Sequence, residues 1–234
     1  MYTVFNQLIK MQAGNKCILY QPIESNVIKE QCLEANKVEI KQSAEKSVIS
    51  TLHWSQQRDI IFSLWPYMLP LALVYFAEYA MQAGAWTAIG FPVKDAKARH
   101  TFYEYAGFAY QLGVFISRSS GTLLQLTSRM LLVLSLVQMI LLGFFCCVAA
   151  FHIWYNWSLL IWCFIVGLCG GAVYVNAFTL IAESVDSSIA EFALSAASVA
   201  DTFGILLADI AGVFLQGCLY SRNGIPGANI NVQC

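Results

Sequence analysis

The sequence has few charged residues for its length. Charged residues make up 12% of its 234 residues and hydrophobic residues 58%, whereas an average soluble domain has about 25% charged residues. Residues 1–59 hold seven of the 13 basic and six of the 14 acidic side chains, which leaves 14 charges for residues 60–234. So few charges cannot cover the surface of a soluble fold of that size. We therefore expect membrane lipid to surround residues 60–234.

Several motifs that carry chemistry are also missing. The net charge of −1 gives no basic surface for nucleic acid, and no GxxxxGK[ST] loop is present for an ATP-driven pump. There is no GxSxG with a triad histidine, and the eight cysteines show neither CxxC pairs nor Cys/His ligand spacing. We expect no enzyme, no cofactor, no metal site and no nucleic-acid partner. Four cysteines lie in apolar runs, where we expect them to pack as small hydrophobic side chains: Cys146, Cys147, Cys163 and Cys169.

Five apolar stretches are long enough to cross a bilayer as helices, which takes about 20 residues. Residues 60–83, 130–151 and 157–182 are strongly hydrophobic. Residues 101–120 and 192–217 are less so, but they carry too few charges for soluble helices and contain many small residues. Open strands are excluded as spanning elements because their backbone groups would lack partners in lipid. The sequence predicts an all-α, multi-pass membrane protein with about five transmembrane helices.

The chain divides into three parts. Residues 1–59 form a mixed-charge polar segment, expected to be a solvated arm that is partly helical around 28–47. Residues 60–220 form the helical bundle, and residues 221–234 form a short polar tail. With the N-terminus in the cytosol, that side collects nine Lys and Arg residues against four on the other, although residues near helix ends alone give a tie. We expect a cytosolic N-terminus.

Polar side chains lie inside four of the five predicted spans, where they are costly and usually face the bundle interior or a water-filled cavity. In 60–83 they share a face with Tyr75 and Tyr79, and in 101–120 they recur every seven residues. The candidates for a substrate or proton pathway are Glu78, Gln82, Glu104, Gln111, Arg118, Asn176, Glu183, Asp201 and Asp209.

Two interpretations of these polar residues remain open. They could pair with one another for structure, as Arg118 would with a carboxylate from another helix. Alternatively, they could line a hydrated cavity in which Glu78, Asp201 and Asp209 exchange protons and Arg118 attracts an anionic group. Their presence on four helices favours the cavity.

Two of the spans carry small residues at every fourth position, a spacing that lets membrane helices approach closely. These residues predict tight packing of 157–182 and 192–217, and they are Gly167, Gly171, Ala196, Ala200, Gly204, Ala208 and Gly212.

Four strings resemble the battenin (CLN3) family of lysosomal and vacuolar membrane proteins. They occur in family order across most of the hydrophobic part, and YQLGVFISRSS is the most specific of them. The strings are FAEYAMQAG (76–84), YQLGVFISRSS (110–120), GGAVYVNAFTLIAE (170–183) and EFALSAASVADTFGI (191–205).

The resemblance implies a fold similar to the major facilitator superfamily, whose battenin members have about eleven spanning helices. This chain would correspond to the C-terminal five, and 21–59 would resemble the central cytosolic loop. The missing N-terminal half would then belong to a longer form or to a partner chain. The family motif residues fall at Glu78, Gln82, Gln111, Arg118, Ser119, Asn176, Glu183 and Asp201.

The resemblance also implies a function in the lysosomal or vacuolar membrane, in luminal pH homeostasis and in transport of small solutes with protons. Basic amino acids and glycerophosphodiesters are the two solute classes. Arg118 favours an anionic solute, whereas the surplus of carboxylates favours a cationic one, so the class stays open. The alternative is a non-transporting membrane adaptor in endosomal or lysosomal trafficking, with 1–59 as its protein-binding arm.

Overall fold

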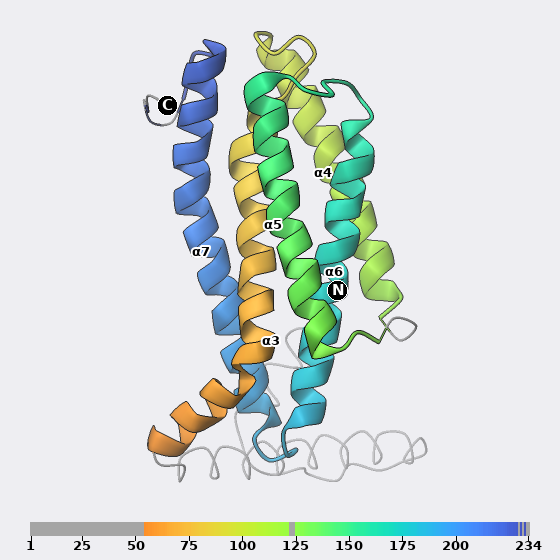
Figure 1. Cartoon of the computed structure of the whole chain (residues 1–234), viewed down its shortest axis with the longest axis vertical. Helices are drawn as coiled ribbons and strands as arrows, with labels where there is room; N and C mark the ends of the chain where they lie inside the picture. Colours follow the sequence, from red (N-terminus) through yellow and green to blue (C-terminus); the bar gives the residue numbers. More distant parts are fainter. Residues whose placement is uncertain (1–53, 122–124, 229, 231, 233–234) are drawn as a thin grey trace, which may run out of the picture. The chain divides into compact units, whose positions relative to one another are not determined.

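The computed structural model describes residues 54–121, 125–228, 230 and 232, and every regular element within them is helical. The predicted helical stretch 28–47 lies outside the described residues. The described residues form five long helices, which run alongside one another (Figure 1). Two short turns, the π-helical η1 (Met81–Ala85) and the 3₁₀ turn η2 (Trp86–Ala88), continue the first of them. The long helices are α3 (Trp54–Ala80), α4 (Ala96–Ser119), α5 (Ser128–Phe151), α6 (Leu159–Ser184) and α7 (Ala190–Asn223).

Each predicted span corresponds to one of these helices, which confirms the all-α membrane fold. Four described segments are long and apolar enough to cross a bilayer: 57–88, 128–151, 159–184 and 190–223. Helix α4 is as long as α5 but falls outside this group, because its sequence is much less hydrophobic. It nevertheless packs along α6.

Helix α3 bends near its beginning (Figure 1). Pro66 and Pro70 lie inside the helix, and proline lacks an N–H while its ring crowds the preceding turn, which is the usual cause of a kink. The neighbouring helix stabilises this stretch, since the Ser135 hydroxyl on α5 donates to the Pro70 carbonyl at 3.0 Å.

Helices α4 and α6 cross in direct backbone contact. A Cβ atom added at Gly113 would overlap the Phe164 carbonyl, and one added at Gly167 would overlap the Tyr110 carbonyl. Gly171 lies against Val114 and Ser117 in the same way. The small residues of α6 therefore pack tightly, as predicted, and their partner is α4.

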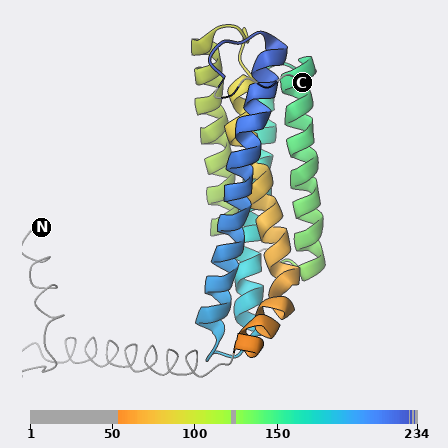
Figure 2. The same ribbon diagram turned by 90° about the vertical axis from the view of Figure 1, so that its left-hand side faces the viewer.

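Helix α7 packs against α3, as the side view in Figure 2 makes visible. A Cβ atom at Gly204 would overlap the Ala72 carbonyl, and one at Gly212 would meet the Ala83 methyl at 2.7 Å. The predicted tight packing of α7 is thus confirmed, with α3 as the partner. The bundle contains two glycine-packed pairs, α4 with α6 and α3 with α7, and α5 packs against α3 and α6.

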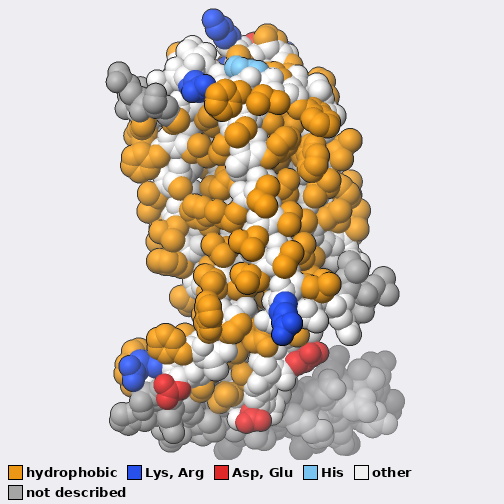
Figure 3. All heavy atoms as spheres, in the orientation of Figure 1, with side chains coloured by type: hydrophobic (Ala, Val, Ile, Leu, Met, Phe, Trp, Pro, Cys, Tyr) orange, Lys and Arg blue, Asp and Glu red, His pale blue; other side chains and the backbone are white. Residues whose placement is uncertain are grey.

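Charged side chains visible in Figure 3 lie toward the two ends of the bundle, with a hydrophobic band between them. We call the end with the beginning of α3 and the α4–α5 and α6–α7 connections the α3-start end. The opposite end, with residues 89–95, the α5–α6 connection and the end of α7, is the α4-start end. Cys146, Cys147, Cys163 and Cys169 are free and lie within the helices α5 and α6. Cys163 is buried and Cys146 and Cys169 are partly buried, as expected, whereas Cys147 is exposed.

Candidate functional site

Glu78 on α3 is buried in the middle of the bundle, with 3% of its surface exposed. The Tyr110 hydroxyl on α4 donates to its Oε2 atom at 2.8 Å, and the Gln138 amide on α5 donates to its Oε1 atom at 2.9 Å. Two donors from two other helices therefore hold this carboxyl group. Both donors suit a carboxylate, which accepts hydrogen bonds at each oxygen.

Helix α6 closes the space around Glu78. A Cβ atom at Gly170 would overlap the Glu78 carboxyl group, so only glycine lets α6 approach that closely. The Gln138 amide also donates to the Val166 carbonyl at 3.0 Å, while its own Oε1 atom is buried without a partner. Helices α3, α4, α5 and α6 thus meet at one polar cluster of Glu78, Tyr110 and Gln138.

Beside this cluster lies a cavity of about 460 Å³, which we call the central cavity. Side chains from α3, α4, α6 and α7 line it, and most of them are polar. They are Tyr75, Tyr79, Gln82, Tyr110, Gln111, Val114, Arg118, Tyr174, Asp201, Thr202 and Ile205. The arrangement places one guanidinium, one carboxyl group and several phenols around one space within the hydrophobic band.

Aromatic groups hold the Arg118 guanidinium at the central cavity. Its Nη2 atom donates to the Tyr75 hydroxyl at 3.3 Å, and its Cζ atom lies 4.1 Å from the centre of the Tyr174 ring. Within the described ranges, the structure records no ion pair for Arg118. Structural pairing of Arg118 with a carboxylate, one of the two interpretations of the sequence, is therefore not what the structure shows. Its charge stays available to an anionic group.

Asp201 and Gln82 supply two further polar groups of the central cavity. Asp201 is half-buried, and its Oδ1 atom accepts from the Thr202 hydroxyl at 3.2 Å. The Gln82 Nε2 atom is buried and has no hydrogen-bond partner. The cavity thus offers a negative group from α7 and a neutral donor from η1 beside the positive group from α4.

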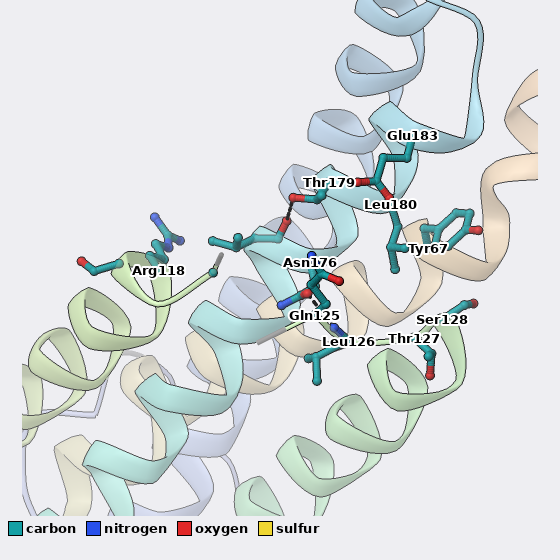
Figure 4. A pocket seen from close by; sticks show the side chains of 13 residues that line it. Tyr67, Arg118, Gln125, Leu126, Thr127, Ser128, Asn176, Thr179, Leu180 and Glu183 are labelled. Atoms are coloured by element: carbon teal, nitrogen blue, oxygen red, sulfur yellow. Dashed lines mark hydrogen bonds between the residues drawn. The ribbon is translucent and has the colours of Figure 1, made fainter. Parts of the chain in front are cut away.

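A second cavity, of about 660 Å³, lies toward the α3-start end and shares Arg118 with the central cavity. Figure 4 shows Arg118 at one side of it and Tyr67 with Glu183 at the other. Asn176 stands between them and connects two elements, since its Oδ1 atom accepts from the Leu126 amide at 2.8 Å and its Nδ2 atom donates to Ala172. Asn176 thereby fixes the α4–α5 connection against α6.

Three candidate residues line neither cavity: Glu78, Glu104 and Asp209. Glu104 is exposed near the α4-start end, where its carboxyl group lies 3.5 Å from the His100 ring on the same helix. Asp209 is exposed on α7, eight residues after Asp201. Although the two aspartates are close in rotation, a rise of 1.5 Å per residue separates them by about 12 Å along the helix. The structure therefore brings together the candidates on α3, the second half of α4, α6 and the first half of α7.

The Glu78 side chain does not lie on the helix face that the sequence spacing predicted for it. Tyr75, Tyr79 and Gln82 line the central cavity, as that spacing indicates, but Glu78 points into the core behind Tyr110. Because Tyr110 lines the cavity and its hydroxyl donates to Glu78, this one side chain lies between the carboxyl group and the cavity.

With this geometry in place, comparisons with known proteins identify the relationship. The profile of the family described as CLN3 protein matches residues 5–221. The chain belongs to the CLN3, or battenin, family. Protein BTN1 of Yarrowia lipolytica is 40% identical over 164 residues, which cover 68% of this chain and 41% of that protein. Protein BTN1 of Saccharomyces cerevisiae is 36% identical over 189 residues, which cover 74% of this chain and 44% of that protein.

This battenin-family chain spans about half the length of the curated relatives it matches. Protein BTN1 of Kluyveromyces lactis, for example, is 32% identical over 214 residues, which cover 86% of this chain and 53% of that protein. No solved structure matches the chain.

Sequence reasoning missed Gln138 and Tyr174, and it gave Tyr110 no role. Gln138 is the single amide in the apolar stretch 130–151, a signal that could have marked it. Tyr110 opens the string YQLGVFISRSS by which the chain resembles the battenin family, but tyrosine is common in membrane helices and its partner lies on another helix.

Proposed function

We propose that this battenin-family chain forms one wall of a pathway for small solutes in the lysosomal or vacuolar membrane. The observation that carries the proposal is the Arg118 guanidinium, which lies at a polar cavity inside the hydrophobic band without a carboxylate partner among the described residues. Charged groups within membrane helices are costly, and a hydrated cavity is the usual setting in which they persist.

The charges of the central cavity suit a solute that carries an anionic group. Arg118 would bind that group, and Asp201 on α7 would face a cationic part of the same solute. A glycerophosphodiester and a basic amino acid both fit this pattern, because each has an anionic group and several members of each class also carry a positive charge. Gln82 and the tyrosines would orient the solute through neutral hydrogen bonds.

Glu78 would hold a proton in this scheme. Its carboxyl group connects to the central cavity through the Tyr110 hydroxyl, at 2.8 Å. A protonated Glu78 carboxyl group would donate one hydrogen bond, whereas the carboxylate only accepts hydrogen bonds. This change would couple solute movement to luminal pH. The remaining wall of the pathway would come from a longer form of the chain or from a partner chain, since related proteins have about twice its length.

The test is solute flux into vesicles that contain the chain, together with the remaining half where the chain alone is inactive. Arg118→Gln and Asp201→Asn are expected to lower flux at least tenfold, because each removes a charge that contacts the solute. Asp209→Asn is the matched control, since it makes the same chemical change on the same helix outside the cavity. Flux equal to that of the wild type in all three variants, at normal protein levels, would instead favour the trafficking-adaptor hypothesis.

A further inference from the structure

Arg99 is a buried arginine at the α4-start end, far along α4 from the central cavity. Only 8% of its surface is exposed, and its stem lies so close to Gly90 that a Cβ atom there would meet the Arg99 Cγ atom. Its Nη1 atom donates to the Val93 carbonyl, whereas its Nε atom is buried without a partner. No carboxylate in the described ranges pairs with it. A buried charge normally has such a partner.

The surroundings of Arg99 increase the positive charge rather than offset it. Arg99 lies in the first turn of α4, where the helix dipole is positive and favours anions. Lys94 and Lys97 flank it in sequence. The nearby Asp95 carboxyl group caps the helix instead, because it accepts from the Lys97 amide at 3.0 Å.

The other groups near Arg99 cannot serve as its counterion. Burial raises the pKa of the Tyr155 hydroxyl, so this group stays neutral and accepts from the Gly90 amide at 3.0 Å. The Tyr220 ring contacts the guanidinium with its face, at 5.6 Å from Cζ, and its hydroxyl donates to the Thr87 carbonyl. The Glu104 carboxyl group lies one turn away and faces His100.

A cavity of about 250 Å³ opens beside Arg99, and its lining includes Thr87, His100, Tyr103 and Tyr220. Pockets for drug-sized ligands are usually larger, at about 300–1,000 Å³, so this one suits a small anion or a single head group. Arg and a helix N-terminus are together a common setting for phosphate recognition in proteins.

The location of the cavity is typical of the membrane surface. Tyr105 and Trp157 are about half exposed and contact each other with ring centres 5.9 Å apart, and Trp154 is 57% exposed in the α5–α6 connection. Exposed Trp and Tyr side chains gather at the level of lipid head groups. The Arg99 cavity therefore lies where phosphate groups are concentrated.

We propose that Arg99 and the first turn of α4 form a binding site for a phosphate group at the α4-start end. The group comes either from a phospholipid head group or from a soluble phosphate compound. The site lies at the opposite end of α4 from Arg118, so the proposal does not depend on the transport function.

The experiment measures thermal unfolding of the purified full chain, with inorganic phosphate in one arm and lipid nanodiscs in the other. Phosphate is compared with chloride at equal ionic strength, and nanodiscs of phosphatidylcholine alone are compared with nanodiscs that include phosphatidic acid. Binding to the folded chain raises Tm with the logarithm of ligand concentration above Kd. A response in the phosphate arm identifies a soluble source, and a response confined to phosphatidic acid identifies a lipid head group.

Arg99→Gln is expected to abolish the rise in Tm in whichever arm shows it, and Arg99→Lys to reduce it. Arg222→Gln is the matched control, because Arg222 is a positive residue at the same end that contacts the Phe151 ring and the Ala150 carbonyl instead. It should keep the full response.

The proposal is overturned if the wild-type chain responds in neither arm, or if Arg99→Gln responds as the wild type does. Should Arg99→Gln fail to fold, native mass spectrometry of the wild-type chain decides the lipid arm. Preferential retention of anionic phospholipid supports the site, and absence of both that preference and a phosphate response contradicts it.

Discussion

The two sides of Tyr110 differ in packing although both are polar. On one side, Glu78 is enclosed by Gln138 and by α6, whose Gly170 leaves no room for a methyl group. On the other side, the contacts that the described residues give Arg118 at the central cavity are with Tyr75 and Tyr174, and Asp201 accepts a hydrogen bond from Thr202 on its own helix. Closed packing supplies the Glu78 carboxyl group with donors from two other helices, whereas the open side keeps its groups available. This contrast separates the residues that hold the bundle together from those that can bind a solute.

The largest effect is expected at the contact between α4 and α6, on the closed side of Tyr110. Gly167→Leu would place a side chain against the Tyr110 backbone, where no space exists, and should lower the free energy of unfolding by about 3 kcal/mol or more. Gly143→Leu on α5 is the control, because nothing lies within 4 Å of a Cβ atom there. Chemical unfolding in detergent measures both. Equal losses would mean that the α4–α6 contact is looser than described.

The next largest effect is expected from a comparison of two glutamines, one on each side of Tyr110. Gln138→Leu removes a donor from the buried Glu78 and from the Val166 carbonyl, which should reduce stability by about 1–3 kcal/mol. Gln111→Leu makes the same chemical change on the exposed side of the central cavity and should leave stability nearly unchanged. The same unfolding assay applies. If Gln111→Leu proved the more damaging variant, the assignment of a closed and an open side would be wrong.

Arg118→Gln should reduce solute flux strongly and stability only slightly. We expect a loss of solute flux of at least tenfold, since a hydrogen bond to a charged group contributes about 1.5–3 kcal/mol. Stability should fall by only about 0.5–1 kcal/mol, the contribution of an exposed cation–π contact. Arg222→Gln, which loses a similar contact to the Phe151 ring, should show the same small loss of stability and normal flux. Loss of folding in Arg118→Gln alone would assign Arg118 a structural role.

The smallest effect is expected at Glu104. Glu104→Gln removes an exposed pair with His100 on the same helix, and such pairs contribute about 0–1 kcal/mol. Flux and stability should both stay close to those of the wild type. A flux loss as large as that of Arg118→Gln would extend the functional surface along α4 beyond the central cavity.

The helices and their close contacts could be predicted from the sequence because each depends on a local pattern. Apolar length gave the spans, and glycine spacing marked the tight faces of α6 and α7. The partners of these faces could not be predicted, since a spacing on one helix does not identify the helix opposite. Gly167 meets Tyr110 and Gly204 meets Ala72, and these are contacts between distant parts of the sequence.

The candidate site was predictable to the same extent. Helical spacing correctly grouped Tyr75, Tyr79 and Gln82, and Gln111 with Arg118. It could not show that the Glu78 side chain turns into the core, because Tyr110 and Gln138 on other helices determine that orientation. Asp201 and Asp209 are close in rotation, but their separation of about 12 Å along the helix axis takes Asp209 out of the cavity.

The most direct test of the central cavity is its access to water. Cysteine introduced by Gln111→Cys lies in the lining, whereas cysteine introduced by Phe108→Cys lies on the outer face of the same helix, where Phe108 is 74% exposed. In membranes that contain the assembled protein, a charged thiol reagent should modify Gln111→Cys much faster than Phe108→Cys, and solute should slow the reaction. Equal, slow modification of both positions would contradict a hydrated solute pathway along this chain.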